Sequence, residues 1–253
     1  MIVFLHGGGG MLDGVQLAQR VGMANSAPGR GYALLAPDAL DQNWNDGRAD
    51  IAAGIDDVGF IRAMLVDLQR RARVDQQRIF ATGASNGGMM SFRLGCEASD
   101  VFRAIAPVIA NMSVDLVQTC RPARGVSVLM IPGTADSLMP YGGGPVAARF
   151  GRRGNVVSSD QTLEHWVRVL DCRQSPTRSR LGRAGDPTSV SILRYQGCSR
   201  DGVALQRWTV EGGGHTWPGT RSNRLVERMF GPTADFAATD VILDFFSQAG
   251  ASR

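Results

Sequence analysis

A short segment in the first half of the chain constrains its fold more than any other part of the sequence. Residues 79–82 are apolar with strand character, residues 83–87 read Gly-Ala-Ser-Asn-Gly, and a helical pattern follows. A serine in a G-x-S-x-G sequence between a strand and a helix sits on a sharp, strained turn where only small neighbours fit. The segment therefore predicts a nucleophilic Ser85, with the amide of Asn86 opening the helix toward developing negative charge. A glycine-rich turn with an incidental serine is the alternative.

A second glycine-rich segment lies at the start of the chain. Ile2–Leu5 reads as a buried strand, and His6 is followed by four glycines. A His-Gly-Gly-Gly run after a strand is the pattern that supplies oxyanion-binding amides in lipases and esterases. The amides of Gly8 and Gly9, together with that of Asn86, are therefore our candidates for an oxyanion hole; a flexible glycine loop is the alternative. We expect His6 to hold this loop rather than to act as a base.

The chain has only three histidines, which narrows the choice of a catalytic base. His6 belongs to the loop just described. His165 falls in a predicted helix, residues 160–170, where it reads as a surface or packing residue. His215 follows the predicted strand 203–210 on a glycine-rich loop that leaves it free to approach a serine. His215 is therefore the candidate base.

An aspartate completes this group of residues. Asp136 lies on a glycine-containing loop just past a predicted strand, residues 126–131, although a turn aspartate that caps local amides would look the same. The order Ser85, Asp136, His215 is that of the α/β-hydrolases. Each of the three follows a predicted strand, so all three should meet at one edge of the sheet. His215 would take the proton of Ser85, and Asp136 would orient the imidazole and stabilise its protonated form.

Composition is that of an ordinary globular protein and limits the partners. The 253 residues suffice for one α/β domain, and without a repeat or linker we expect a single catalytic domain over residues 1–253. Hydrophobic residues make up 43% of the chain, yet no apolar run is long enough to span a membrane. The net charge is +4 and the basic residues, all arginines, are scattered, so we expect no nucleic-acid partner.

The chain has four cysteines, whose number and spacing indicate the cellular compartment and whether a metal site is expected. Three pairings are possible, and proximity in the sequence favours Cys96 with Cys120 and Cys172 with Cys198. An even number of cysteines favours disulfides formed in an oxidising compartment, and four free buried thiols are the alternative. No C-x-x-C or other zinc-type spacing occurs, so we expect no metal site. The proposed chemistry needs no other cofactor.

The rest of the chain is assigned more coarsely. We expect Trp44, on a polar loop, to line the pocket, with an ordinary half-buried tryptophan as the alternative; the charges of Asp56 and Asp57 at a helix start read as solvated. Residues 141–158 read as a surface loop beside the site, and 173–188 as a polar excursion. The other predicted strands are 32–36, 102–109 and 190–195, and the other predicted helices are 13–25, 56–72 and 237–246.

Several of these motifs also point to a family. Residues 83–90, 133–136 and 213–219, with Trp-Asn-Asp-Gly-Arg at 44–48 and Asp-Asp-Val-Gly-Phe-Ile at 56–61, resemble the secreted family that includes extracellular polyhydroxybutyrate depolymerases and feruloyl esterases. The resemblance covers nearly the whole chain, and the His-Thr-Trp-Pro-Gly run is its most specific part. It implies an α/β-hydrolase fold, with a mostly parallel sheet and helices on both faces, the same triad, and a secreted or periplasmic location. It also supports the two favoured disulfide pairings.

One motif and one departure from the family add further expectations. Trp217, inside the His-Thr-Trp-Pro-Gly run, is with Trp44 a candidate substrate contact. Relatives carry a leader and early strands before the oxyanion strand, whereas here Met1 almost opens that strand. The resemblance therefore suggests missing early N-terminal strands, which would leave one edge of the 32–36 strand uncovered and favour self-association.

The sequence favours a carboxylic-ester hydrolase that works through an acyl-enzyme. The expected substrates are feruloyl or related hydroxycinnamoyl esters of the plant cell wall, and short acyl esters. An extracellular polyhydroxybutyrate depolymerase, acting on a polyester, would use the same triad, but such enzymes often carry an added domain or an exposed apolar face. An acetyl xylan esterase, a serine peptidase on the same fold and a non-catalytic binding module are less favoured.

Overall fold

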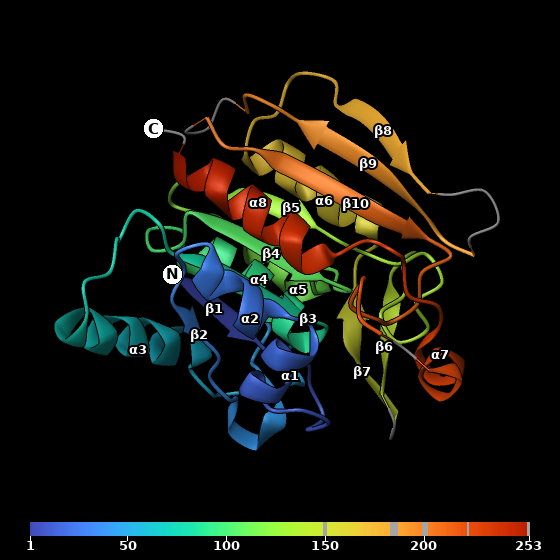
Figure 1. Cartoon of the computed structure of the whole chain (residues 1–253), viewed down its shortest axis with the longest axis horizontal. Helices are drawn as coiled ribbons and strands as arrows, with labels where there is room; N and C mark the ends of the chain where they lie inside the picture. Colours follow the sequence, from blue (N-terminus) through green and yellow to red (C-terminus); the bar gives the residue numbers. More distant parts are fainter. Residues whose placement is uncertain (149–150, 183–186, 199–201, 222, 252–253) are drawn as a thin grey trace.

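The fold is known from a computed structural model that describes residues 1–148, 151–182, 187–198, 202–221 and 223–251. Its centre is an eight-stranded sheet in the order β2-β1-β3-β4-β5-β10-β9-β8 (Figure 1). The strands of this sheet are β1 (Ile2–Leu5), β2 (Leu34–Leu35), β3 (Phe80–Ala84), β4 (Ala104–Val108), β5 (Ser127–Met130), β8 (Thr177–Leu181), β9 (Ser189–Tyr195) and β10 (Leu205–Glu211).

The sheet is mostly parallel, as predicted. Strands β1 to β5 and β10 pair in parallel, and only β9 and β8 add antiparallel neighbours. The carboxyl ends of six strands consequently lie along one edge of the sheet, which is where α/β proteins place their sites. Strand β1 lies between β2 and β3, the strand that leads to the serine.

Helices cover both faces of the sheet (Figure 1). Within β1, Val3 and Leu5 join the apolar layer that contains residues of α3 to α6, whereas Ile2 and Phe4 join the layer that contains residues of α1, α2 and α8. This alternation explains why a strand that is buried on both faces reads as a continuous apolar run. The helices are α1 (Gly14–Arg20), α2 (Met23–Gly29), α3 (Asp57–Arg71), α4 (Asn86–Glu97), α5 (Val114–Thr119), α6 (Ser159–Val169), α7 (Arg224–Phe230) and α8 (Ala238–Ala251).

Several segments differ from the sequence-based expectation. The helix predicted at 13–25 is divided into α1 and α2, because Gly22 adopts a left-handed conformation with φ of 77°. Only Leu34 and Leu35 of the predicted 32–36 strand pair with β1. The polar excursion at 173–188 contains β8, whose side chains are all exposed at the sheet edge and therefore carry no apolar pattern. The short helices α5 and α7, of six and seven residues, were not predicted.

The region predicted as a surface loop, residues 141–158, forms a β-hairpin instead. Its strands are β6 (Gly144–Ala148) and β7 (Gly151–Val156), which form a separate two-stranded sheet. Glycine and arginine dominate β7, so the sequence shows no alternation of apolar and polar residues. The hairpin lies to one side of the central sheet (Figure 1).

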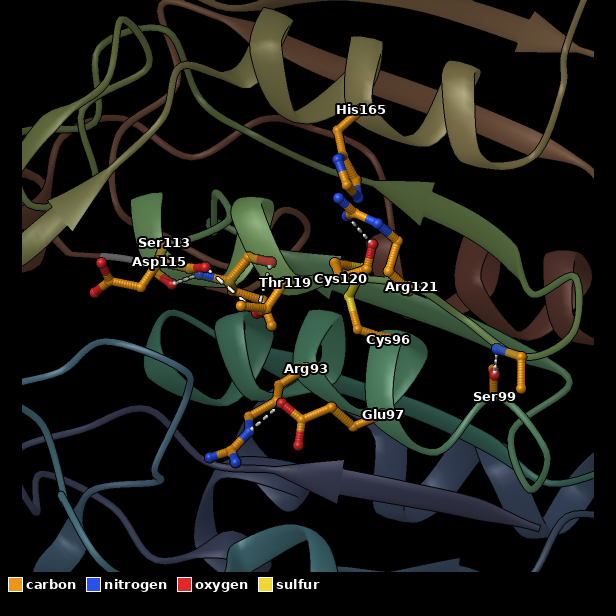
Figure 2. The surroundings of a disulfide bond; sticks show 12 residues. Arg93, Cys96, Glu97, Ser99, Ser113, Asp115, Thr119, Cys120, Arg121 and His165 are labelled. Carbon is orange, nitrogen blue, oxygen red and sulfur yellow. Dashed lines mark hydrogen bonds and ion pairs between the residues drawn. A yellow bond between two sulfur atoms is a disulfide. The ribbon is translucent and has the colours of Figure 1, made fainter.

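Both predicted disulfides are present. Cys96 bonds to Cys120 and Cys172 bonds to Cys198. The first bond joins the end of α4 to the residue that follows α5, as Figure 2 shows. Disulfides that close loops of this length typically stabilise a fold by about 2–4 kcal/mol. The bond therefore secures the far end of the helix that begins beside Ser85.

His165 lies near the Cys96–Cys120 bond and is a packing residue, one of the two roles predicted for it. Its ring is buried on α6 and points toward Arg121 (Figure 2), and its Nδ1 lies 3.3 Å from Nη2 of Arg168. Burial, followed by the charges of Arg168 and Arg121, lowers the pKa of His165 from 6.5 to about 4. The folded protein therefore holds this imidazole in its neutral form.

This buried histidine should make the fold sensitive to acid. Because its folded pKa is depressed, the stability that depends on neutral His165 is fully present above pH 6.5 and is lost as the pH falls toward about 4. We expect the parent protein to lose about 2–3 kcal/mol more unfolding free energy than His165→Gln between about pH 7.5 and pH 4.5. Urea unfolding of both proteins at the two pH values measures this difference. Equal losses would contradict it.

Candidate active site

The strand-turn-helix segment has the strained geometry that its sequence predicts. Ser85 lies between β3 and α4 with φ of 56° and ψ of −120°, a conformation that costs energy for a residue with a side chain. A β-carbon on Gly83 would lie 2.5 Å from the carbonyl oxygen of Leu5, and one on Gly87 would lie 2.2 Å from the same atom. The two glycines are therefore required by the close approach of β1 to the turn.

Asp136 and His215 meet at the carboxyl edge of the sheet. Nδ1 of His215 donates a hydrogen bond to Oδ2 of Asp136 over 2.7 Å. The carboxylate is buried, and its other oxygen accepts the amides of Leu138 and Met139 at 2.9 and 2.8 Å. With Nδ1 protonated in this way, Nε2 of the neutral ring is left as an acceptor, which is the arrangement that a general base needs.

The loops that carry these two residues are joined by backbone contacts. The amide of Ala135 donates to the carbonyl oxygen of Gly213, and the amide of Thr134 donates to that of Val210. Ser85 lies on the same sheet edge, at the end of β3, with its amide bonded to the carbonyl oxygen of Val108 at 3.0 Å. The sheet order thus brings the three predicted triad residues to one edge, with Asp136 and His215 in direct contact.

His6 holds the glycine loop, as predicted. Its Nδ1 donates to the carbonyl oxygen of Gly7 at 2.7 Å, and its Nε2 accepts the amide of Ala39 at 3.0 Å. Both ring nitrogens are thereby engaged, so this histidine is not available as a base. A β-carbon built on Gly7 would lie 3.7 Å from Cβ of Ser85, which places the loop directly beside the serine.

The three predicted oxyanion donors differ in availability. Asn86 is the first residue of α4, where a backbone amide has no partner within the helix. Gly8 lies against Asn86, since a β-carbon on Gly8 would be 3.2 Å from that of Asn86. The amide of Gly9, in contrast, donates to the carbonyl oxygen of Gln42 at 3.1 Å. Gly8 and Asn86 are therefore the better pair of candidates in this conformation.

Comparison with known proteins supports this reading of the fold. Models of known protein families give no match to the chain. Over 210 residues the chain is 30% identical to feruloyl esterase C of Emericella nidulans, across 81% of this chain and 71% of the relative.

The chain belongs to the feruloyl esterase family.

Other relatives of this family member are longer. Feruloyl esterase B of Piromyces equi is 31% identical over 182 residues, which cover 71% of this chain and 32% of the relative. The putative esterase NocK of Nocardia uniformis subsp. tsuyamanensis is 32% identical over 232 residues, 87% of this chain and 65% of the relative. The chain thus spans about a third of one relative and just under two thirds of the other.

Solved structures confirm the predicted α/β-hydrolase fold. An acetyl xylan esterase from Aspergillus awamori superposes with a TM-score of 0.59 at 12% identity, covering 97% of this chain and 88% of that chain. Esterase PE8 gives a TM-score of 0.56 at 16% identity, covering 98% and 91%. At such low identities the likeness concerns the fold alone.

Both predicted substrate-contact tryptophans of this feruloyl esterase family member are buried. Trp44 is fully buried, and its Nε1 donates to the carbonyl oxygen of His6 at 3.1 Å. Trp217 is also buried, packs 5.7 Å from the ring of Phe4 and donates from Nε1 to the hydroxyl of Thr239. The polar edges of both indoles are bonded within the protein, and contact with a substrate stays a prediction for both.

Sequence reasoning missed a buried ion pair beside the candidate oxyanion hole. Nη2 of Arg48 lies 2.6 Å from Oδ2 of Asp46, and both side chains are almost entirely buried. The amide nitrogen Nδ2 of Asn86 donates to the same oxygen of Asp46 at 2.6 Å. The motif Trp-Asn-Asp-Gly-Arg was visible in the sequence, but nothing in its composition distinguishes a buried pair from a polar surface loop.

The reading of Asp57 as solvated was also wrong. Its side chain is buried, and Oδ2 accepts the amide of Asn45 at 2.6 Å. Burial is the main cause that raises the pKa of Asp57. Its neighbour Asp56 caps α3 by accepting the amide of Gly59. One carboxylate thus starts the helix, while the other anchors the polar loop that contains Trp44.

The described residues contain neither a metal-binding cluster nor a membrane-spanning helix. Among them, no group of three or more His, Cys, Asp or Glu side chains is arranged to hold a metal ion. None of the helices in the described part of the chain combines the length and apolar character needed to cross a membrane.

The Asp46–Arg48 pair should be important for stability. Removing one partner of a buried pair leaves the other charge uncompensated, which typically costs about 3–5 kcal/mol. We expect Asp46→Ala to lower the unfolding free energy by about that amount. Asp100→Ala is the matched control, because Asp100 forms an exposed pair with Arg62 and such pairs contribute at most about 1 kcal/mol. Equal effects of the two substitutions in urea unfolding would contradict the prediction.

Proposed function

We propose that this chain is a carboxylic-ester hydrolase that uses Ser85, His215 and Asp136 as a catalytic triad. The observation that carries the proposal is the 2.7 Å hydrogen bond from Nδ1 of His215 to a buried carboxylate, which two backbone amides also hold. A carboxylate fixed in this way orients the ring and stabilises the imidazolium that forms during catalysis.

The proposed reaction passes through an acyl-enzyme. Nε2 of His215 takes the hydroxyl proton while Oγ of Ser85 attacks the ester carbonyl carbon. The amides of Gly8 and Asn86 stabilise the resulting oxyanion. Collapse of this intermediate breaks the ester bond, and His215 returns the proton to the departing alcohol. Water, activated by the same histidine, then attacks the acyl-enzyme and releases the acid.

We propose feruloyl and related hydroxycinnamoyl esters, with short acyl esters, as the substrates. The supporting observation is family membership, because two of the relatives are named feruloyl esterases. A secreted or periplasmic location is part of this proposal. The two disulfides support it, since such bonds form and persist in oxidising compartments.

One surface feature favours the alternative, a polyester depolymerase. Met11 and Leu40 are 69% and 64% exposed on segments next to the glycine loop, and Leu225 and Met229 of α7 are 66% and 58% exposed. The end of α7 contacts the catalytic loop, because the carbonyl oxygen of Phe230 accepts the amide of His215. Exposed apolar side chains on both sides of the proposed site could rest on a solid polyester surface.

The triad can be tested by substitution. Ser85→Ala and His215→Ala should each abolish hydrolysis of p-nitrophenyl acetate while the protein stays folded, because the two residues act as one unit. Asp136→Asn should cost about 10⁴-fold in turnover, since it permits the wrong imidazole tautomer. A fluorophosphonate probe should label the parent and not Ser85→Ala. His165→Gln is the control and should hydrolyse the ester at the parent rate near neutral pH. Near-parental turnover by His215→Ala would overturn the assignment.

A substrate panel separates the two candidate functions. The panel contains p-nitrophenyl acetate to decanoate, methyl ferulate, acetylated xylan and a polyhydroxybutyrate suspension. We expect the highest kcat/KM on methyl ferulate and the short p-nitrophenyl esters, and little clearing of the suspension. Clearing of the polyester that Ser85→Ala lacks, together with weak activity on methyl ferulate, would instead establish the depolymerase.

A further inference from the structure

The segment from Gln42 to Arg48, here called the 42–48 segment, contacts both halves of the candidate oxyanion hole. On the glycine-loop side, the carbonyl oxygen of Gln42 accepts the amide of Gly9, and Nε1 of Trp44 donates to the carbonyl oxygen of His6. On the helix side, the side chain of Asn86 accepts the amide of Trp44 at 2.8 Å and donates to its carbonyl oxygen at 2.9 Å.

Gly8 lies in close contact with the side chains of Asn43 and Asn86. A β-carbon on Gly8 would lie 2.7 Å from Oδ1 of Asn43 and 3.2 Å from Cβ of Asn86. The side chain of Asn43 is thus pressed against the loop that carries one candidate donor. A shift of Asn43 would therefore change the separation between the amides of Gly8 and Asn86.

The 42–48 segment is itself tied to the β6–β7 hairpin. Nη1 of Arg48 donates to the carbonyl oxygen of Arg153 in β7 at 2.6 Å. In return, Nη1 of Arg153 donates to Oδ1 of Asn43 at 3.0 Å. Asp46 bonds both Arg48 and Asn86. The contacts therefore connect the start of α4 to the buried ion pair, the ion pair to the hairpin, and the hairpin to the glycine loop through Asn43.

We propose that Arg153, with the buried Asp46–Arg48 pair, positions the two donors of the oxyanion hole. The proposal rests on the function proposed above and deepens it. Amides that stabilise an oxyanion are effective only when they are already aimed at the place where charge develops, and small displacements are costly. Arg153 fixes Asn43 against Gly8, while Asp46 fixes the side chain of Asn86. The hairpin, which stands outside the central sheet, is thereby coupled to catalysis.

Arg153→Ala tests this role without removing the buried pair. We expect kcat for methyl ferulate and p-nitrophenyl acetate to fall about 10-fold with KM unchanged within about twofold, because only transition-state stabilisation is weakened. The Ki of phenylboronic acid, which mimics the tetrahedral intermediate, should rise by the same factor. Arg153→Lys should recover part of the loss. Arg62→Ala, which removes the α3 partner of Asp100 in a surface ion pair, is the control and should leave all three quantities unchanged.

Asn43→Ala examines the same contact from its other side. If the two side chains act through one another, Asn43→Ala should lower kcat to a similar extent, and the double variant should lose little more than either single variant. Thermal melts of each variant confirm that it is folded at the assay temperature.

Three results would overturn the positioning role. They are a kcat of Arg153→Ala within about twofold of the parent, a fall in kcat without a rise in the Ki of phenylboronic acid, and a change confined to KM, which would indicate direct substrate contact. Failure of the proposed function would look different, because Ser85→Ala would then retain activity whatever Arg153 does.

Discussion

The close approach between β1 and the turn that carries Ser85 determines much of the rest of the structure. The carbonyl oxygen of Leu5 occupies the space where β-carbons on Gly83 and Gly87 would lie. This contact allows α4 to begin directly beside the end of β1, so that the glycine loop passes next to the serine. A side chain at either glycine would separate the strand from the helix, and with them the candidate nucleophile from the candidate oxyanion donors.

The polar groups around this contact are buried and bonded rather than solvated. Asp46, Arg48 and Asn86 satisfy one another, and Asp57 accepts the amide of Asn45. Buried charges are a poor source of net stability, because desolvation offsets their attraction. Their value here is geometric: each fixes a backbone segment that borders the site. The residues that must be buried and bonded for the chain to fold are therefore the same residues that hold the proposed oxyanion donors in place.

Much of the fold and of the candidate site could be predicted from the sequence, because each prediction rests on a local rule. Ile2–Leu5 and residues 79–82 are apolar runs typical of buried strands. The glycines on either side of Ser85 predict the strained turn. Three histidines, sorted by their local context, left His215 as the base candidate. The segments β8 and α7 were missed because they have no buried side chains, and the β6–β7 hairpin was missed because β7 is rich in glycine and arginine and lies outside the central sheet.

The sequence by itself determined the order of the main strands and helices, the turn at Ser85 and the candidate triad, because these depend on neighbours within a few residues. Only the tertiary structure decided the environment of each polar side chain. Trp44 was expected to line a pocket or be half-buried and Asp57 to be solvated, yet both are buried once the 42–48 segment folds between α3 and α4. The contact of Arg153 with Asn43, 110 residues away, is likewise set by long-range packing, which no local pattern encodes.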